Sequence, residues 1–216
     1  MVDLIRGLEP ARVRAALGEV RERVGEAVEV VVATKYVPVD ELPALREAGV
    51  TILGENRAQD LQAKHRSHPD LLYEFIGHLQ SRKVRQVAPL VRRIHSVASD
   101  SVVTQLARHG RADLELLVEV NLAGESGKSG VAPRDLDAFL ERLRAAGGGE
   151  VAGLMTMPPL ASDAEDSRPW FAALRGLAAD RDLRHLSMGT SQDYEVAAQE
   201  GATIVRLGGR ILSPRG

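Results

Sequence analysis

The sequence predicts one (β/α)8 barrel, an α/β fold of the TIM-barrel type, with an extra helix at its N-terminus. Short apolar, β-branched segments alternate with helical segments along the chain, as in parallel βαβ units. This alternation supplies eight strands. The 216 residues contain no linker or change in composition, so we expect a single domain over residues 1–216. An open, doubly wound sheet is the alternative.

The first half of the chain predicts an opening helix and four strand–helix units. In residues 10–24, Val13, Leu17, Val20 and Val24 recur at the spacing of one helix face. The strands that follow are predicted at residues 28–34, 51–53, 72–76 and 93–97. Their helices are predicted at 39–48, around Ala58 and Leu61, at 79–90 and at 100–108.

The second half repeats the same order. Strands are predicted at residues 114–121, 151–156, 185–187 and 203–207, with helices at 133–146, 168–179 and up to Glu200. Pro133 suits the first turn of its helix, because proline lacks the N–H that a first turn leaves unpaired. The two longest segments without a helix pattern, 124–130 and 157–166, are interpreted as barrel loops.

The composition excludes several classes of protein. The net charge of −2 and the 3% of aromatic residues favour no nucleic-acid partner, and the absence of cysteine excludes disulfides and thiolate metal sites. No segment has the pattern of a signal peptide or a membrane span, so we expect a cytoplasmic protein. We expect no metal site, because His65, His68 and His78 lack a matching carboxylate pattern. The glycine-rich segment 124–130 lacks the spacing of a nucleotide-binding P-loop.

Lys35 is the first candidate for chemistry. It follows the apolar run Val30 to Ala33, and a buried parallel strand that ends on a cation places that cation where the interior meets solvent. A partly desolvated lysine is more readily neutral, and a neutral amine can form a Schiff base with an aldehyde. The alternative is a lysine that merely reaches into water.

Other polar residues follow the predicted strands, and the carboxyl ends of barrel strands form the reactive face of this fold. Arg206 lies within an apolar strand, where a charge needs a protein or ligand acceptor. The loops after the last two strands are a frequent phosphate site, and here they contain Ser191, Gly208 and Gly209. The remaining candidates on this face are Asn56, His78, Asn121 and Ser187.

Several ordered motifs resemble those of the pyridoxal phosphate homeostasis proteins, which are single-domain relatives of the alanine racemase barrel domain. The motifs are V-V-A-T-K-Y, L-G-E-N-R-A-Q-D, F-I-G-H-L-Q-S-R-K, I-H-S-V, V-E-V-N-L-A-G-E-S-G-K-S-G, G-L-M-T-M, L-S-M-G-T-S-Q-D and V-R-L-G. They extend from the first predicted strand to the last.

This resemblance implies that the barrel holds pyridoxal 5′-phosphate (PLP) as a Schiff base on Lys35. It implies that Arg206 faces the pyridine nitrogen and that Ser191, Gly208 and Gly209 hold the phosphate. The residues implied to line the cofactor are Asn56, His78, Ser187 and Met188. Family members usually carry Ser or Thr at the position of Gly209 and a small residue at that of Arg210. A hydroxyl donor is therefore missing here, and the Arg210 guanidinium is expected to replace or exceed it.

The resemblance also implies a monomer that buffers PLP or delivers it to PLP-dependent apo-enzymes in vitamin B6 homeostasis. We expect no catalytic residue, because the sequence shows neither the second base nor the second domain that a racemase of the related type uses. An arginine beside the ring nitrogen would also keep that nitrogen unprotonated and make the cofactor a weaker electron sink. The alternative is a PLP-dependent amino-acid racemase or lyase that uses Lys35 as its base. Lys128 is an open candidate for a second aldehyde site.

Overall fold

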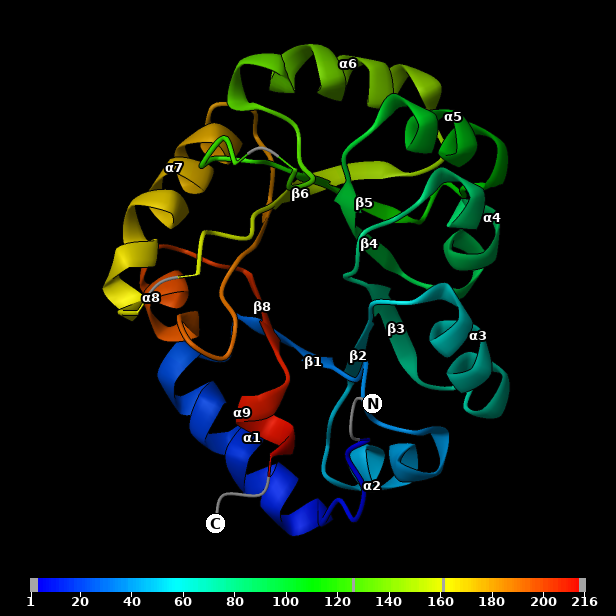
Figure 1. Ribbon diagram of the computed structural model, residues 1–216, viewed down its shortest axis with the longest axis vertical. Coiled ribbons are helices and arrows are strands. Elements are labelled where there is room, and N and C mark those ends of the chain that lie inside the picture. The colour runs from blue at the N-terminus through cyan, green and yellow to red at the C-terminus, as the bar shows by residue number, and fades with distance from the viewer. Residues whose placement is uncertain (1–3, 126, 161, 214–216) are drawn as a thin grey trace.

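The computed structural model describes residues 4–125, 127–160 and 162–213, and these residues form one closed barrel of eight parallel strands (Figure 1). Each strand pairs with the next in chain order, and β8 pairs with β1. The strands are β1 (Glu29–Ala33), β2 (Ile52–Glu55), β3 (Leu72–Phe75), β4 (Arg93–Val97), β5 (Glu115–Glu119), β6 (Glu150–Met155), β7 (His185–Ser187) and β8 (Ile204–Leu207). The predicted fold class is confirmed, and the open sheet is not.

Helices surround the barrel as an outer ring (Figure 1). The α-helices are α1 (Pro10–Val24), α2 (Leu42–Glu47), α3 (Ala58–Ser67), α4 (Val84–Val87), α5 (Asp100–His109), α6 (Leu136–Ala146), α7 (Arg168–Ala179), α8 (Tyr194–Gln199) and α9 (Gly209–Leu212). The predicted extra helix is α1, which contacts α2, α8 and α9.

The first helix forms where its apolar spacing predicts. Pro10 occupies the first turn, and Val13, Leu17 and Val20 are buried against the barrel. The helix ends at Gly25, whose φ of 86° lies in the region that favours glycine.

The helix predicted at residues 79–90 is wrong in its extent. It consists of a 3-10 turn at Ser81–Lys83, the single α-turn of α4, and a second 3-10 turn at Ala88–Leu90. Pro89 lies in that last turn, and proline removes the N–H that a continuing α-helix needs.

Two strand boundaries matter for the site. Strand β1 ends at Ala33 rather than at residue 34, so Lys35 lies in the turn after the strand. Strand β2 continues through Gly54 to Glu55, beyond the end predicted at residue 53.

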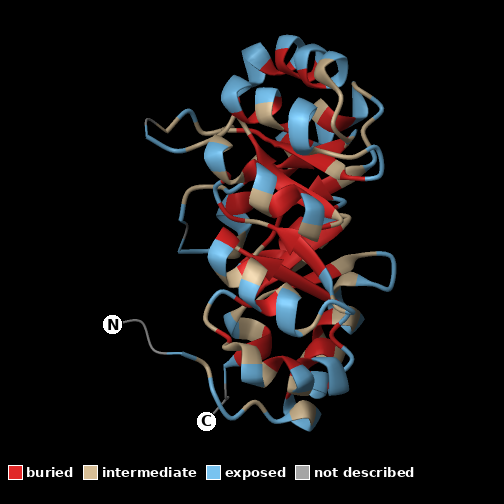
Figure 2. Ribbon diagram, turned by 90° about the vertical axis from the view of Figure 1, so that its right-hand side faces the viewer, coloured by how far each residue is buried: buried red, intermediate tan, exposed pale blue. Residues whose placement is uncertain are grey.

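The core has two layers. The larger layer packs the outer face of the barrel against the helices, and the strands appear as the buried centre of the molecule in Figure 2. Inside the barrel, a smaller apolar cluster comprises Val31, Ile52, Leu117, Ala152, Met155 and Ile204. Polar side chains also fill the barrel interior, including the fully buried Glu74 and His95. Among the described residues, no helix is long and apolar enough to cross a membrane.

Candidate functional site

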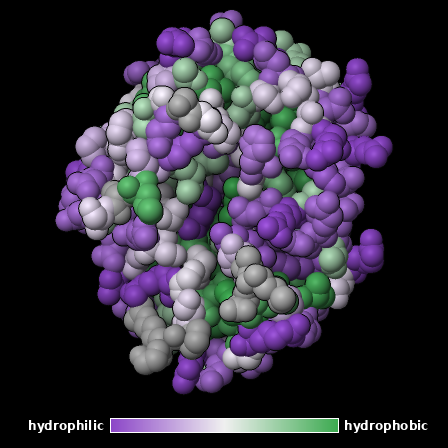
Figure 3. All heavy atoms as spheres, in the orientation of Figure 1, coloured by the Kyte–Doolittle hydropathy of each residue, from purple (hydrophilic) through white to green (hydrophobic). Residues whose placement is uncertain are grey.

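The ends of β7 and β8 bring Ser187 and Arg206 together. Residues alternate between the two faces of a strand, and Ile204 belongs to the inner cluster, so Arg206 also faces the barrel interior. The Arg206 Nη1 atom donates to Ser187 Oγ at 2.5 Å, and both side chains are buried. Figure 3 shows a hollow near the middle of the face turned toward the viewer, with both hydrophilic and hydrophobic residues beside it.

Arg206 has one strong acceptor and one weak one at its other terminal nitrogen. Its Nη2 atom lies 3.0 Å from the carbonyl oxygen of Thr156 and 2.9 Å from the sulfur of Met157. A thioether is a weak acceptor, and Met157 is 49% exposed, so a ligand atom with a better lone pair can replace it. Burial lowers the pKa of Arg206 to about 10, although Asp193 and Glu119 oppose the shift, and the side chain stays cationic at neutral pH.

Ser191 is the centre of a small anion cradle. Its Oγ atom accepts from the backbone N–H groups of Gly208, at 3.4 Å, and Arg210, at 3.3 Å. The turn that carries Ser191 depends on Gly189, because its φ is 91° and an added Cβ would lie 2.6 Å from that of Ala197. Two N–H groups and a hydroxyl at one point are a donor set that suits a phosphate oxygen.

The cradle lies beside the end of β1. A Cβ built on Gly208 would lie 3.6 Å from the carbonyl oxygen of Ala33, two residues before Lys35. Gly209 is exposed and begins α9. The structure therefore places the predicted phosphate residues next to the turn that carries the predicted lysine.

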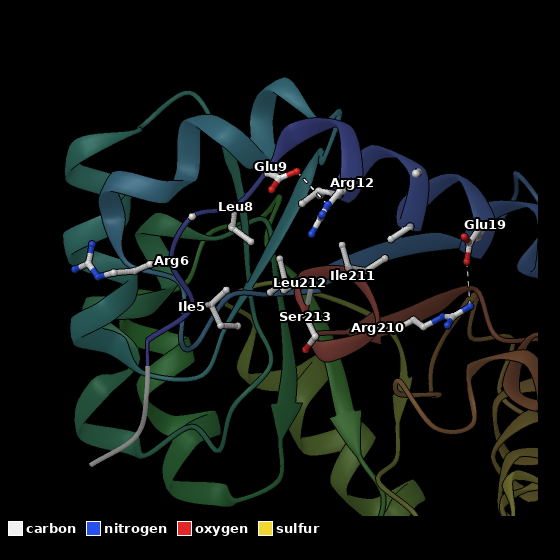
Figure 4. Close-up of a pocket in the computed structure, with 14 residues that line it drawn as sticks. Ile5, Arg6, Leu8, Glu9, Arg12, Glu19, Arg210, Ile211, Leu212 and Ser213 are labelled. Carbon is white, nitrogen blue, oxygen red and sulfur yellow. Dashed lines mark hydrogen bonds and ion pairs between the residues drawn. The ribbon is translucent and has the colours of Figure 1, made fainter. Parts of the chain in front are cut away.

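The guanidinium of Arg210 does not join this cradle. Its Nη2 atom lies 3.3 Å from Glu19 Oε2 of α1, at a cavity of about 320 Å³ between α1, α9 and residues 5–9 (Figure 4). The expectation that this guanidinium replaces a hydroxyl donor is thus wrong for this structure. Only the backbone N–H of Arg210 points at Ser191.

Lys35 is exposed, so the expected partial desolvation is also wrong for this structure. Its Nζ atom lies 4.7 Å from the centre of the Tyr36 ring, a cation–π contact. The lysine lines a cavity of about 490 Å³ with Arg57, Asp60 and Lys64. No other predicted cofactor residue lines that cavity among the described residues.

The backbone just before Lys35 is fixed by a buried ion pair. Lys64 Nζ lies 2.5 Å from Glu55 Oε1 and donates to the carbonyl oxygen of Thr34 at 2.6 Å. The Thr34 hydroxyl also donates to Glu55. The turn that carries Lys35 therefore starts from a rigid point.

Asn56 and His78 lie together in a third cavity, of about 230 Å³. The Oδ1 atom of Asn56 is buried without a hydrogen-bond partner, while the His78 side chain is exposed. An unpaired buried oxygen is costly, and a ligand donor would satisfy it. Met188, in contrast, is fully buried in the layer between sheet and helices, so the structure does not bring its side chain to the cofactor residues.

Sequence reasoning missed three inward-facing polar residues, Glu74, His95 and Glu119. One oxygen of Glu119 accepts from Ser129, and the other is buried without a partner. The available signal was a titratable residue within an otherwise apolar strand, such as Glu119 in L-L-V-E-V and His95 in I-H-S-V.

Lys128 lines a neighbouring cavity of about 520 Å³ with Met157, whose sulfur contacts Arg206, and with Gln192, which follows Ser191. Its Nζ atom forms an ion pair with Glu125 at 2.5 Å. Within the described ranges, no three His, Asp or Glu side chains are placed to hold a metal ion.

These features define a (β/α)8 barrel with a cluster of hydrogen-bond donors around Ser191 and a buried arginine at the carboxyl ends of its last two strands. Residues 9–212 match the model of the alanine racemase N-terminal domain family. The chain is 37% identical to the pyridoxal phosphate homeostasis protein of Aquifex aeolicus, with 85% of each chain covered. It is 33% identical to the protein of that name from Pseudomonas aeruginosa, covering 95% of this chain and 94% of the relative. The chain therefore belongs to the alanine racemase N-terminal domain family, and within it to the pyridoxal phosphate homeostasis proteins.

Solved structures agree with this assignment. PipY of Synechococcus elongatus without PLP matches with a TM-score of 0.86 and 31% identity, covering 93% of this chain and all of that one. PipY with PLP bound matches with a TM-score of 0.83 and 30% identity over the same shares. Lysine decarboxylases at 13–15% identity share the fold alone.

Proposed function

We propose that this protein binds PLP at the carboxyl ends of its barrel strands and takes part in PLP homeostasis by buffering the cofactor or delivering it to apo-enzymes. The observation that carries the proposal is the pair of donor groups at the ends of β7 and β8, with Arg206 inside β8 and the Ser191 cradle in the loops after these two strands. The PLP-bound PipY relative supports the choice of ligand.

The residues present fit this ligand. In the described part of the chain, the Nη2 atom of Arg206 contacts a carbonyl oxygen and a weakly accepting thioether, and an unprotonated pyridine nitrogen could replace the thioether. Ser191 and the N–H groups of Gly208 and Arg210 would hold the phosphate, with Gly209 beside them. Asn56 Oδ1 lacks a donor that a ligand hydroxyl could supply.

PLP supplies an aldehyde, and we propose that the Lys35 amine holds it as a Schiff base with loss of water. Lys35 would have to turn from the Tyr36 ring toward the Ser191 cradle beside the end of β1. His78 and Ser187 would line the site, Ser187 through its contact with Arg206.

The carrier role predicts transfer without turnover. We expect the loaded protein to activate a PLP-dependent apo-enzyme and to leave added D- and L-amino acids unchanged, when compared with an equal concentration of free PLP. Burial raises the pKa of Tyr194, which makes this tyrosine a poor second base. Amino-acid turnover that disappears with Lys35→Arg would instead establish the racemase or lyase alternative.

Replacing the hydroxyl of the cradle should weaken phosphate binding selectively. For Ser191→Ala we expect about tenfold weaker binding of PLP, the typical effect of one hydrogen bond to a charged group. Binding of pyridoxal, which lacks the phosphate, should not change. Ser162→Ala, in an exposed segment, serves as the control. An equal loss for both ligands would show that Ser191 does not contact the phosphate.

The monomeric and cytoplasmic state and the Lys128 site stay predictions. Size-exclusion chromatography with light scattering would test the first of them.

A further inference from the structure

A continuous hydrogen-bonded chain runs through the barrel interior from Arg206 to the opposite end of the barrel. Arg206 donates to Ser187 Oγ at 2.5 Å, and Ser187 Oγ lies 2.8 Å from His95 Nδ1. The other ring nitrogen, His95 Nε2, lies 2.7 Å from Glu74 Oε2. The four side chains are at most 6% exposed.

The arginine at one end, the carboxylate at the other and a neutral imidazole between them fix the direction of every hydrogen bond. Burial lowers the pKa of His95, so only one of its ring nitrogens carries a hydrogen, and that nitrogen is the one that faces Glu74. An arginine can only donate, so Ser187 Oγ accepts from Arg206 and its own hydrogen is free to point at His95 Nδ1. His95 Nδ1 then carries the lone pair and Nε2 carries the hydrogen, which is donated to the Glu74 carboxylate. Each donor in this arrangement meets an acceptor, and a second proton on His95 would leave the Ser187 hydrogen without one.

Glu74, at the far end of this series of hydrogen bonds, is held by two arginines. Glu74 Oε1 accepts from Arg92 at 2.7 Å and from Arg93 at 3.0 Å, and Arg93 also pairs with Glu29 and Glu115. Burial acts to raise the pKa of Glu74, but His95 and the two arginines outweigh it and hold the carboxyl below its usual range. The carboxylate is therefore a fixed, charged acceptor for His95.

Few other contacts constrain the orientation of the Arg206 guanidinium, at the near end of this series. The remaining contacts of the guanidinium are the Thr156 carbonyl and the exposed thioether of Met157. Among residues 4–125, 127–160 and 162–213, Ser187 is the only buried side-chain oxygen that accepts from Arg206, and it depends on His95 for its orientation.

We infer that His95 is a positioning residue for Arg206: through Ser187 it holds the guanidinium in the orientation that donates to the ring nitrogen of bound PLP. This inference rests on the proposed function. On this inference, the preference for a ligand with a pyridine nitrogen over one without it depends on His95, which does not touch the ligand.

The test compares PLP with its analogue in which a CH group replaces the ring nitrogen, each bound to wild type, His95→Leu and His95→Gln. The amide of glutamine can accept from Ser187 and donate to Glu74, whereas leucine can do neither. We expect His95→Leu to bind PLP about tenfold more weakly than wild type, with unchanged affinity for the analogue. His95→Gln should restore the preference for PLP.

If His95 had a purely structural role, His95→Leu would bind PLP and the analogue more weakly by the same factor, and that result would overturn the inference. If His95→Leu does not fold, Ser187→Ala interrupts the same chain by removing one atom, and it must show the same selective loss. Unchanged PLP affinity in Ser187→Ala would likewise overturn it. Failure of the wild type to bind either ligand would contradict the proposed function itself, which keeps the two failures distinct.

Discussion

Lys35→Arg should lose the visible absorption band that wild type acquires with PLP. Arginine keeps the positive charge at this position but its guanidinium is not a nucleophilic amine at neutral pH, so no C=N bond forms. PLP should still bind, more weakly, through Arg206 and the Ser191 cradle. An absorption titration, followed by desalting, measures both effects.

Two other lysines provide matched controls. Lys128→Arg changes an amine that is paired with Glu125 in another cavity, and Lys83→Arg changes one beside Gln86. Both variants should keep the band. If Lys35→Arg kept it and Lys128→Arg lost it, the assignment of the attachment site would be wrong.

Glu74→Leu should destabilise the fold by about 3–5 kcal/mol, the usual effect of removing one partner from a buried ion pair. Arg92 and Arg93 would lose one of the two carboxylates that they share, with Glu29 remaining, and His95 would lose the acceptor of its Nε2–H. Urea denaturation, followed by circular dichroism, measures the change in the free energy of unfolding.

Glu150→Gln is the matched control, since Glu150 pairs with Arg184 at an exposed position. Solvent screens such pairs, so this variant should unfold at nearly the same urea concentration as wild type. An equally small effect for Glu74→Leu would show that the interior network does not hold the barrel together.

The fold could be predicted because its determinants are local and periodic. The alternation of Val30, Val31 and Val32 with helical segments indicates a barrel strand without knowledge of any contact. The prediction of one helix at 79–90 overlooked Pro89 as a stop signal, whereas the packing of α4 against α3 and α5 is not visible in the sequence.

The site was predicted less completely. Arg206 stands out as a charge in an apolar strand, and Ser191 as a hydroxyl in one of the two loops where barrels frequently bind phosphate. The series of hydrogen bonds from Arg206 to Glu74 uses side chains from β8, β7, β4 and β3. Closure of the barrel brings these four strands around one interior, and the sequence does not show that arrangement. Likewise, the direction of the Arg210 side chain depends on Glu19, which is 191 residues away in the sequence.

The attachment of PLP to Lys35 is tested most directly by borohydride reduction of the loaded wild-type protein, followed by proteolysis and mass spectrometry. Reduction converts a C=N bond to a stable C–N bond and marks the lysine that held the aldehyde. We expect the phosphopyridoxyl group on the peptide that contains Lys35. Its recovery on Lys128 or Lys64 alone, or on no lysine, would contradict the proposed site.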